Sequence, residues 1–180
     1  MSRLHRAVTA VVAMAAIGLM STVLSGTAAN ASSTDPLVAR VSGYTYVLLG
    51  PSVFGVTVQQ DPLRYSAVLG PDGSVRGEWS YRYYEAGVLT TFSGPVTCLT
   101  VHGNRAWLGG PITRSSDPTQ LGSGAWWQVA DNGNGRHPVV PDQTTFAGIG
   151  TMQQTADYCA NAPDPKHIFD VQLGGVQVTD

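Results

Sequence analysis

Charge is scarce in this sequence, and lysine and glutamate are nearly missing. Only 12% of the 180 residues are charged, lysine occurs once, glutamate occurs twice, and the formal net charge is −2. No cluster of basic residues occurs, so nothing in the chain indicates the positive surface that binds nucleic acid or an anionic membrane. We therefore expect neither as a partner, and the partner itself stays unassigned.

The sequence also lacks the signatures of common catalytic and metal sites. The G-x-S-x-G turn of serine hydrolases does not occur. No His or Cys residues have the spacing of a zinc site. The turn Asp131–Gly135 lacks both the ligand spacing and the bidentate Glu of a calcium loop. We therefore predict no catalytic residue, no metal and no cofactor.

Two enzymatic alternatives compete with this prediction. Glu78 is one candidate acid for glycoside hydrolysis, but its position between Arg76 and Arg82 on one strand face favours a cross-strand ion pair. The other alternative is a hydrolase that combines a loop Asp with one of the three His residues after residue 31, namely His102, His137 and His167. His102 is expected at a hairpin tip, where an exposed imidazole is ordinary.

The first 31 residues have the three-part pattern of a secretory signal peptide. Arg3 and Arg6 give a positive start, an apolar run extends from Ala7 to Leu24, and Ala29-Asn30-Ala31 matches an A-x-A cleavage site. A retained membrane anchor is the alternative, because the run is close to the shortest length that spans a bilayer. We expect a helical signal peptide over residues 1–31 and a secreted, extracellular protein without a membrane partner after signal removal.

The rest of the chain is expected to form one β domain. Residues 32–43 are small and polar and predict a flexible leader, which leaves residues 44–180 for the domain. The 21 Gly and 11 Pro residues favour short strands joined by turns. The predicted fold is all-β, an antiparallel meander. Large and small side chains mix on the inward faces, which favours a small closed barrel; a two-sheet β-sandwich is the alternative.

The segment Pro95–Ile112 predicts a β-hairpin. Gly103 supplies the positive φ that the first central position of a type II′ turn requires. Residue 98 then lies opposite 109, 99 opposite 108, and 101 opposite 106. The predicted core face carries Thr97, Leu99, Val101, Ala106, Leu108 and Ile112. The predicted outer face carries Val96, Cys98, Thr100, His102, Arg105, Trp107 and Gly109.

Cys98 and Cys159 are the only cysteines, and both follow the predicted signal peptide. An even number of cysteines in an exported chain favours a disulfide. Gly109, opposite Cys98, leaves room for the sulfur to bond a distant segment. No C-x-x-C motif is present, so a redox pair is not indicated. A short helical piece near Thr151–Tyr158 is expected beside Cys159.

The candidate ligand-binding residues are five aromatic side chains: Trp79, Tyr81, Tyr83, Trp107 and Trp126. The first three share one face of the predicted strand Val75–Tyr84, which is either a sugar-stacking platform or simply part of the core. Trp126 is the better candidate for exposure, because Trp127 takes the inward face of their strand. Trp107 shares the face of Cys98 and is expected to cover the disulfide.

The run V-T-C-L-T-V-H-G-N-R-A-W-L-G-G-P-I fits the pattern V-x-C-L-x-V-x-G-N-x-A of a hairpin, and W-Q-V-A-D-N-G fits a V-x-D-N-G turn that precedes Asp142. In these motifs the chain resembles a family of small secreted bacterial β-rich proteins of unassigned function. The resemblance covers residues 53–142 and departs from the family pattern at Trp126-Trp127. It implies export and a β-rich fold, and no activity comes with it.

These observations together predict a secreted non-enzymatic β-domain that binds a small ligand or a carbohydrate through aromatic residues. This prediction requires a cavity or patch lined by aromatic side chains. The hydrolase alternative requires His137 or His167 within hydrogen-bond reach of a carboxylate. A third alternative, a protease-inhibitor-like interaction module, requires a rigid exposed loop such as Arg114–Ser123.

Overall fold

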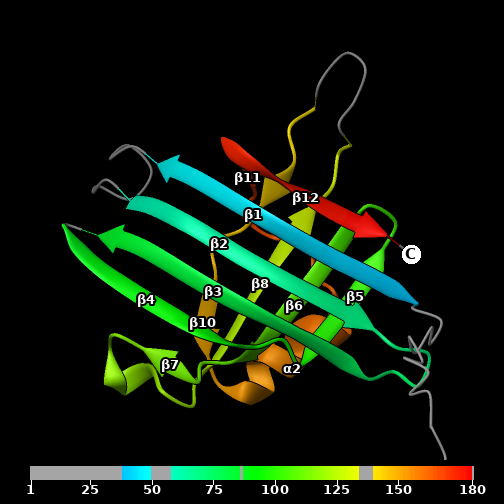
Figure 1. Cartoon of the computed structure of the whole chain (residues 1–180), viewed down its shortest axis with the longest axis horizontal. Helices are drawn as coiled ribbons and strands as arrows, with labels where there is room; N and C mark the ends of the chain where they lie inside the picture. Colours follow the sequence, from blue (N-terminus) through cyan, green and yellow to red (C-terminus); the bar gives the residue numbers. More distant parts are fainter. Residues whose placement is uncertain (1–37, 50–57, 86, 134–139, 180) are drawn as a thin grey trace, which may run out of the picture. The chain divides into compact units, whose positions relative to one another are not determined.

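The structure is a computed structural model that describes residues 38–49, 58–85, 87–133 and 140–179 (Figure 1). The chain divides into a unit Met1–Ser33 and a unit Thr34–Asp180, and every described residue belongs to the second. The predicted signal peptide, residues 32–37 of the predicted leader, and His137 lie outside the described residues.

Most of the described chain is β-strand, which confirms the all-β class. The elements in chain order are β1 (Ala39–Leu49), β2 (Val58–Leu69), β3 (Val75–Glu85), β4 (Val88–Pro95), β5 (Cys98–His102), β6 (Arg105–Pro111), β7 (Arg114–Ser115), η1 (Pro118–Gln120), β8 (Gly124–Ala130), β9 (Gln143–Thr144), β10 (Gly148–Gly150), α2 (Met152–Asn161), β11 (Phe169–Asp170) and β12 (Leu173–Thr179). Among the helices of the described part, none has the length and apolar character needed to cross a membrane.

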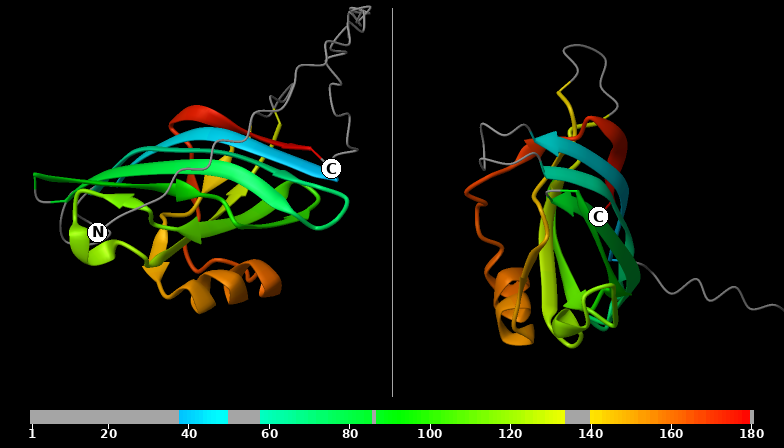
Figure 2. Two further views of the ribbon diagram at one scale, coloured as in Figure 1. Left: turned by 60° about the horizontal axis from the view of Figure 1, so that its bottom comes forward. Right: turned by 90° about the vertical axis from the view of Figure 1, so that its left-hand side faces the viewer.

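The strands form two antiparallel sheets. Sheet A has the order β12-β1-β2-β3-β4-β7. Sheet B has the order β11-β9-β8-β6-β5, and β10 pairs with the other end of β8. The views in Figure 2 show sheet A, sheet B and α2 as successive layers, with α2 on the outer side of sheet B.

The hydrophobic core lies between the two sheets and draws on both. Its buried members are Val41, Leu63, Tyr65, Ala67, Trp79, Tyr81, Phe92, Val96, Leu99, Ala106, Leu108, Ile112, Ala125, Trp127, Val129 and Val176. Trp127 on β8 is fully buried, and its ring lies 5.5 Å from that of Trp79 and 5.9 Å from that of Tyr65 on the facing sheet. These three rings connect the two layers at the centre of the core.

The described strands do not close into a barrel, so the preferred prediction is corrected and the sandwich alternative fits. The edge of β12 shows why this side of sheet A does not continue into sheet B. The amide of Val176 donates to Asp142 Oδ2 at 2.7 Å, and the amide of Val178 donates to Asp131 Oδ2 at 3.0 Å. Carboxylates thus satisfy edge donors that a neighbouring strand would use in a closed barrel.

The D-N-G turn and Asp142 form a polar network behind this edge. Asp142 Oδ1 accepts from the amide of Asn132 at 2.9 Å, and the Asn132 side chain donates to the carbonyl of Pro141 at 2.7 Å. Asn104, at the hairpin tip, donates to the carbonyl of Asp131 at 2.9 Å. The two sequence motifs therefore meet in space, and their polar residues hold the turn, the hairpin tip and β12 together.

Replacing Asp142 with Asn should lower the free energy of unfolding by about 2 kcal/mol, because a carboxylate that accepts two backbone amides becomes a group with only one acceptor atom. Urea unfolding followed by circular dichroism measures the loss. Asp164→Asn is the matched control, since its ion pair with Arg105 is largely exposed and should contribute less than about 1 kcal/mol. Equal losses in the two variants would contradict the assigned role of Asp142.

The predicted central hairpin is confirmed in its register. Cys98 pairs with Gly109, Leu99 with Leu108, and Val101 with Ala106. Gly103 has a φ of 59°, as the predicted turn requires. The register of this hairpin could be predicted from sequence because its two strands and the turn between them are consecutive in the chain.

The predicted faces are wrong at the start of the hairpin. Thr97 was placed on the core face but is exposed, and Val96 was placed on the outer face but is buried in the core. The chain passes from sheet A to sheet B between Pro95 and Cys98. The amide of Val96 donates to Gly77 at 2.9 Å and that of Thr97 donates to Gly109 at 2.8 Å, so the two-residue alternation is broken at this crossing.

Three strand boundaries also differ from those predicted. β1 begins at Ala39, within the predicted leader, because both β2 and β12 pair with it there. β2 is a single strand over Val58–Leu69, with a register shift between Asp61 and Arg64. β12 continues through the Gly174-Gly175 pair; Gly174 has a φ of 106°, and a Cβ there would collide with the backbone of Tyr44.

Candidate functional site

Three of the five candidate aromatics belong to the core or pack against it. Trp79 and Tyr81 on β3 are 3% and 4% exposed, and Tyr83 is partly buried against the same cluster. The rings of Tyr81, Tyr83 and Phe92 stack on one another inside the sandwich. The structure therefore places this strand face in the core, the alternative to the sugar-stacking platform.

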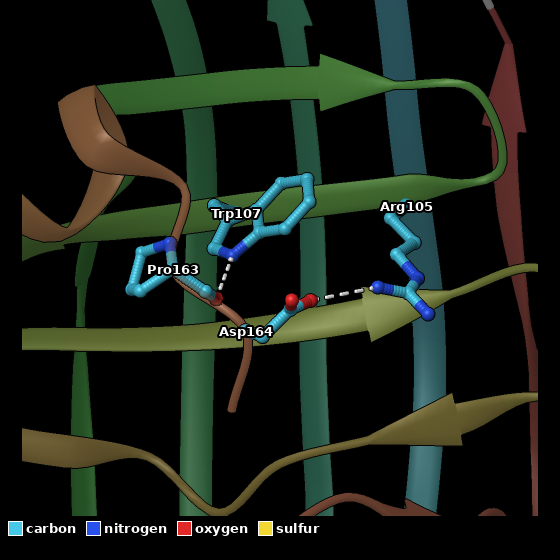
Figure 3. A network of polar contacts seen from close by, with 4 residues as sticks. All are labelled: Arg105, Trp107, Pro163 and Asp164. Atoms are coloured by element: carbon cyan, nitrogen blue, oxygen red, sulfur yellow. Dashed lines mark hydrogen bonds and ion pairs between the residues drawn. The ribbon is translucent and has the colours of Figure 1, made fainter. Parts of the chain in front are cut away.

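Trp107 on β6 lies on the outer face of sheet B, where the chain after α2 covers it (Figure 3). Its Nε1 donates to the carbonyl of Pro163 at 2.9 Å, and its side chain is 3% exposed. Beside it, Arg105 forms an ion pair with Asp164 at 3.0 Å. These two contacts fix the segment that leaves α2 against the sheet, so Trp107 has a structural role and no open ring face.

The predicted disulfide between Cys98 and Cys159 is confirmed, with the Cα atoms 6.1 Å apart. It joins β5 to α2, so it fixes the helix on sheet B. α2 begins with a capping box in which Thr151 Oγ1 accepts from the Gln154 amide and the Gln154 side chain accepts from the Thr151 amide. A Cβ at Gly109 would lie 2.5 Å from Thr155 of α2 and 3.2 Å from Cys98 Sγ. The missing side chain therefore leaves room for both the helix and the disulfide.

The fifth aromatic, Trp126, lines an open cavity at the side of sheet B. The cavity has a volume of about 340 Å³, a size typical of small-ligand sites. Its walls come from β8, from the segment 145–148, from α2 and from the chain before β11. Its lining residues are Trp126, Thr145, Phe146, Ala147, Gly148, Tyr158, Pro165, Lys166, His167 and Phe169. We call this space the aromatic cavity.

Ring contacts organise the walls of the aromatic cavity. The rings of Trp126 and Tyr158 are 6.1 Å apart, which pairs β8 with α2. The ring of Phe169 is 5.1 Å from that of Phe146 and 6.5 Å from that of His167. Five rings from four segments thus surround one hollow, with flat ring faces that stack on planar or sugar-like ligands.

Two glycines of β10 fit closely around Trp126. A Cβ at Gly148 would lie 2.5 Å from the indole, and one at Gly150 would lie 2.9 Å from it. Any larger residue at Gly148 would displace the indole from its position on the cavity wall. The glycines therefore set the orientation of Trp126, the only one of the four tryptophans that is not fully buried in the described structure.

Polar groups in the aromatic cavity are few. Desolvation raises the pKa of Tyr158 to about 12, and a hydrogen bond with the Thr145 side chain opposes that rise. The Tyr158 hydroxyl is therefore neutral at physiological pH and is able to donate a hydrogen bond. Lys166, the single lysine of the chain, is exposed at the cavity and provides a positive charge there.

Sequence reasoning identified only Trp126 among the five rings of this cavity. Tyr158 lies on the predicted helical piece, but nothing in its spacing indicated which way it faces. Phe146, His167 and Phe169 lie in the part of the chain that contains the short strands β9, β10 and β11. β9, β10 and β11 are only two or three residues long, too short for a periodic signal.

The features required by the hydrolase alternative are not found in the described part of the chain. His102 is exposed and its ring lies against Trp107, and His167 stacks on Phe169 without a carboxylate partner. Among the described residues, no group of His, Cys, Asp or Glu side chains is positioned to hold a metal ion. The expected ion pair of Glu78 is not formed either; the residues opposite it are Ser66 and Pro95.

The loop Arg114–Ser123, which the interaction-module alternative requires, is held by hydrogen bonds at both ends. The amide of Ile112 donates to Ser123 at 2.8 Å, and the amide of Thr91 donates to Ser116 Oγ at 3.0 Å. Its centre is the 3₁₀ turn η1, capped by Asp117, whose carboxylate accepts from Thr119. The loop therefore presents a compact turn, whereas a protease cleft binds an extended segment.

No protein-family model, no curated protein and no solved structure matches this chain.

Proposed function

We propose that this protein is a secreted, non-enzymatic binding domain whose aromatic cavity takes a small ring-bearing ligand, with a neutral carbohydrate as the first class to test. The observation that supports the proposal most strongly is the open hollow surrounded by Trp126, Tyr158, Phe146, Phe169 and His167. Flat apolar rings with one neutral hydroxyl nearby suit a ligand that offers an apolar face and a few hydroxyl groups.

The construction of the cavity also supports binding. Its walls are fixed before any ligand arrives, because the disulfide holds α2 and the contacts at Pro163 and Asp164 hold the following segment. A preformed cavity loses little conformational entropy on binding. The disulfide also fits an oxidising compartment, which agrees with the proposed export by the N-terminal signal peptide.

Trp126 provides both the test and the readout. Titration with neutral oligosaccharides of several linkages should change the tryptophan fluorescence, and Trp126→Ala should weaken binding of the active sugar by about tenfold or more, since aromatic stacking contributes about 0.5–1.5 kcal/mol beyond the buried area. Isothermal titration calorimetry gives the affinities independently of the fluorophore.

Trp79→Phe is the control, because Trp79 is a buried core tryptophan outside the cavity and its Nε1 makes no hydrogen bond in the described structure. This variant should keep the affinity of the unmodified protein. Binding that survives Trp126→Ala, or that is lost equally in the control, would place the ligand elsewhere. Failure of every ring-bearing compound to bind would refute the proposed function.

A further inference from the structure

The outer face of sheet A carries a second hollow, unrelated to the aromatic cavity. Tyr65, Trp79, Tyr81 and Phe92 point into the core, so the alternate residues of the same strands face outward. No described element covers this face; α2 lies on the opposite side of the sandwich (Figure 2). The hollow has a volume of about 470 Å³. We call it the sheet A groove.

The groove follows from the pattern of side-chain sizes across four neighbouring strands. Its floor is made of Ser66, Ser80 and Ser93, which leave the backbone almost uncovered. Longer side chains stand at the sides, with Arg64 on β2 and Arg114 on β7. Ser80 pairs with Arg64 on one side and with Ser93 on the other, and Ser93 pairs with Arg114, so these residues form one row across the sheet.

The two arginines of this row are available to a ligand. Arg64 lies with its guanidinium 4.8 Å from the centre of the Tyr44 ring, and it forms no ion pair with another described residue. Arg114 likewise has no ion-pair partner in the part of the chain that the structure describes. The contact with the Tyr44 ring does not use the hydrogen-bond donors of Arg64, so its guanidinium N–H groups can still bind a ligand.

The other groups of the groove narrow the chemistry of the ligand. Three serine hydroxyls and the carboxylate of Glu78 can exchange hydrogen bonds with hydroxyl groups. Arg64 and Arg114 are three strands apart, roughly 14 Å at the usual strand spacing, so they suit an extended molecule with separated anionic groups. Glu78 between them opposes a polymer that is negative at every unit, such as a nucleic acid.

We propose that the sheet A groove binds an acidic oligosaccharide, whose carboxylates pair with Arg64 and Arg114 and whose hydroxyls lie over the three serines. Guanidinium groups bind carboxylates through two parallel hydrogen bonds, and this geometry gives recognition of uronic acids over neutral sugars. The sequence showed no basic cluster because the strands bring these arginines together from positions far apart in the chain. This inference does not rest on the function proposed for the aromatic cavity.

The test measures binding of a hyaluronan oligosaccharide, in which uronic acid units alternate with neutral sugar units, to the full chain by isothermal titration calorimetry. Arg64→Gln/Arg114→Gln should weaken binding by about tenfold or more, since hydrogen bonds to charged groups are the stronger class. The matched control is Arg105→Gln, which removes a charge from sheet B and should leave the affinity unchanged. The fully methyl-esterified oligomer, which has the same backbone without the charge, should bind much more weakly. The affinity for the acid form should also fall between about 0.02 M and about 0.3 M NaCl.

Several outcomes would overturn this proposal. They are no binding of the hyaluronan oligosaccharide at millimolar concentration, equal binding of the esterified oligomer, and an equal loss in Arg105→Gln. Tighter binding of a single-stranded oligonucleotide would favour a nucleic-acid site instead. Trp126→Ala separates the two proposals, because it should abolish binding at the aromatic cavity and leave binding of the hyaluronan oligosaccharide intact.

Discussion

Trp127→Ala is expected to lower the free energy of unfolding by about 3–5 kcal/mol, the largest loss of any single substitution in this domain. Trp127 is fully buried, and its ring meets Trp79 and Tyr65 of the facing sheet. Removing it deletes the apolar contacts that join the two sheets and leaves a cavity at their centre. Chemical unfolding followed by far-ultraviolet circular dichroism measures the loss.

Two further variants identify the cause of this loss. Trp127→Phe should be the milder change, because it keeps much of the ring and removes an Nε1 that is buried without a hydrogen-bond partner. Trp126→Ala removes the same side chain from the next position, where the indole is only partly buried, and should cost less than half as much. Equal losses at Trp126 and Trp127 would show that the core is not organised around Trp127.

The adjacent tryptophans also show how far sequence reasoning reaches. Strand alternation placed Trp127 inward and Trp126 outward, and the structure agrees with both assignments. Alternation could not show what lies outside Trp126, because the other four rings come from later segments of the chain that only the tertiary fold brings to β8. The orientation of a residue within a strand is local information, whereas the wall opposite it depends on the tertiary fold.

The same limit explains why the barrel was preferred. Each hairpin of the meander was predictable, because neighbouring strands and their turns are close in sequence. β12 pairs with β1 along one edge. Whether its other edge pairs with a second strand or donates to Asp131 and Asp142 depends on segments that are distant in sequence. The D-N-G motif was visible in the sequence. The role of its Asp131, and of Asp142, becomes clear only when β12 lies beside these two carboxylates.

The distribution of charge is a third feature that the sequence alone could not predict. Arg64 and Arg114 are separated by fifty residues, and neither has a basic neighbour, so the sequence indicated no positive surface. Pairing of β2, β3, β4 and β7 places them in one row. Composition correctly describes the charge of the whole chain, but it says nothing about how a sheet distributes that charge between its faces.

Removing the disulfide is expected to lower the free energy of unfolding by about 4 kcal/mol, because the bond between Cys98 and Cys159 spans 61 positions and restricts the unfolded chain. A domain of this size is usually stable by about 5–15 kcal/mol, so the reduced protein should be marginal. Urea unfolding of the unmodified protein with and without reductant measures the difference.

The variant Cys98→Ala/Cys159→Ala shows whether the effect comes from the bond itself. Its stability should match that of the reduced protein, and reductant should change it no further. Hydrogen exchange should show a loss of protection for the slowest amides of both sheets, which exchange through global unfolding, and a further loss in α2, which the disulfide attaches to β5. A loss below about 1 kcal/mol would mean that the capping box and the contacts of Trp107 and Tyr158 hold the helix without the covalent bond.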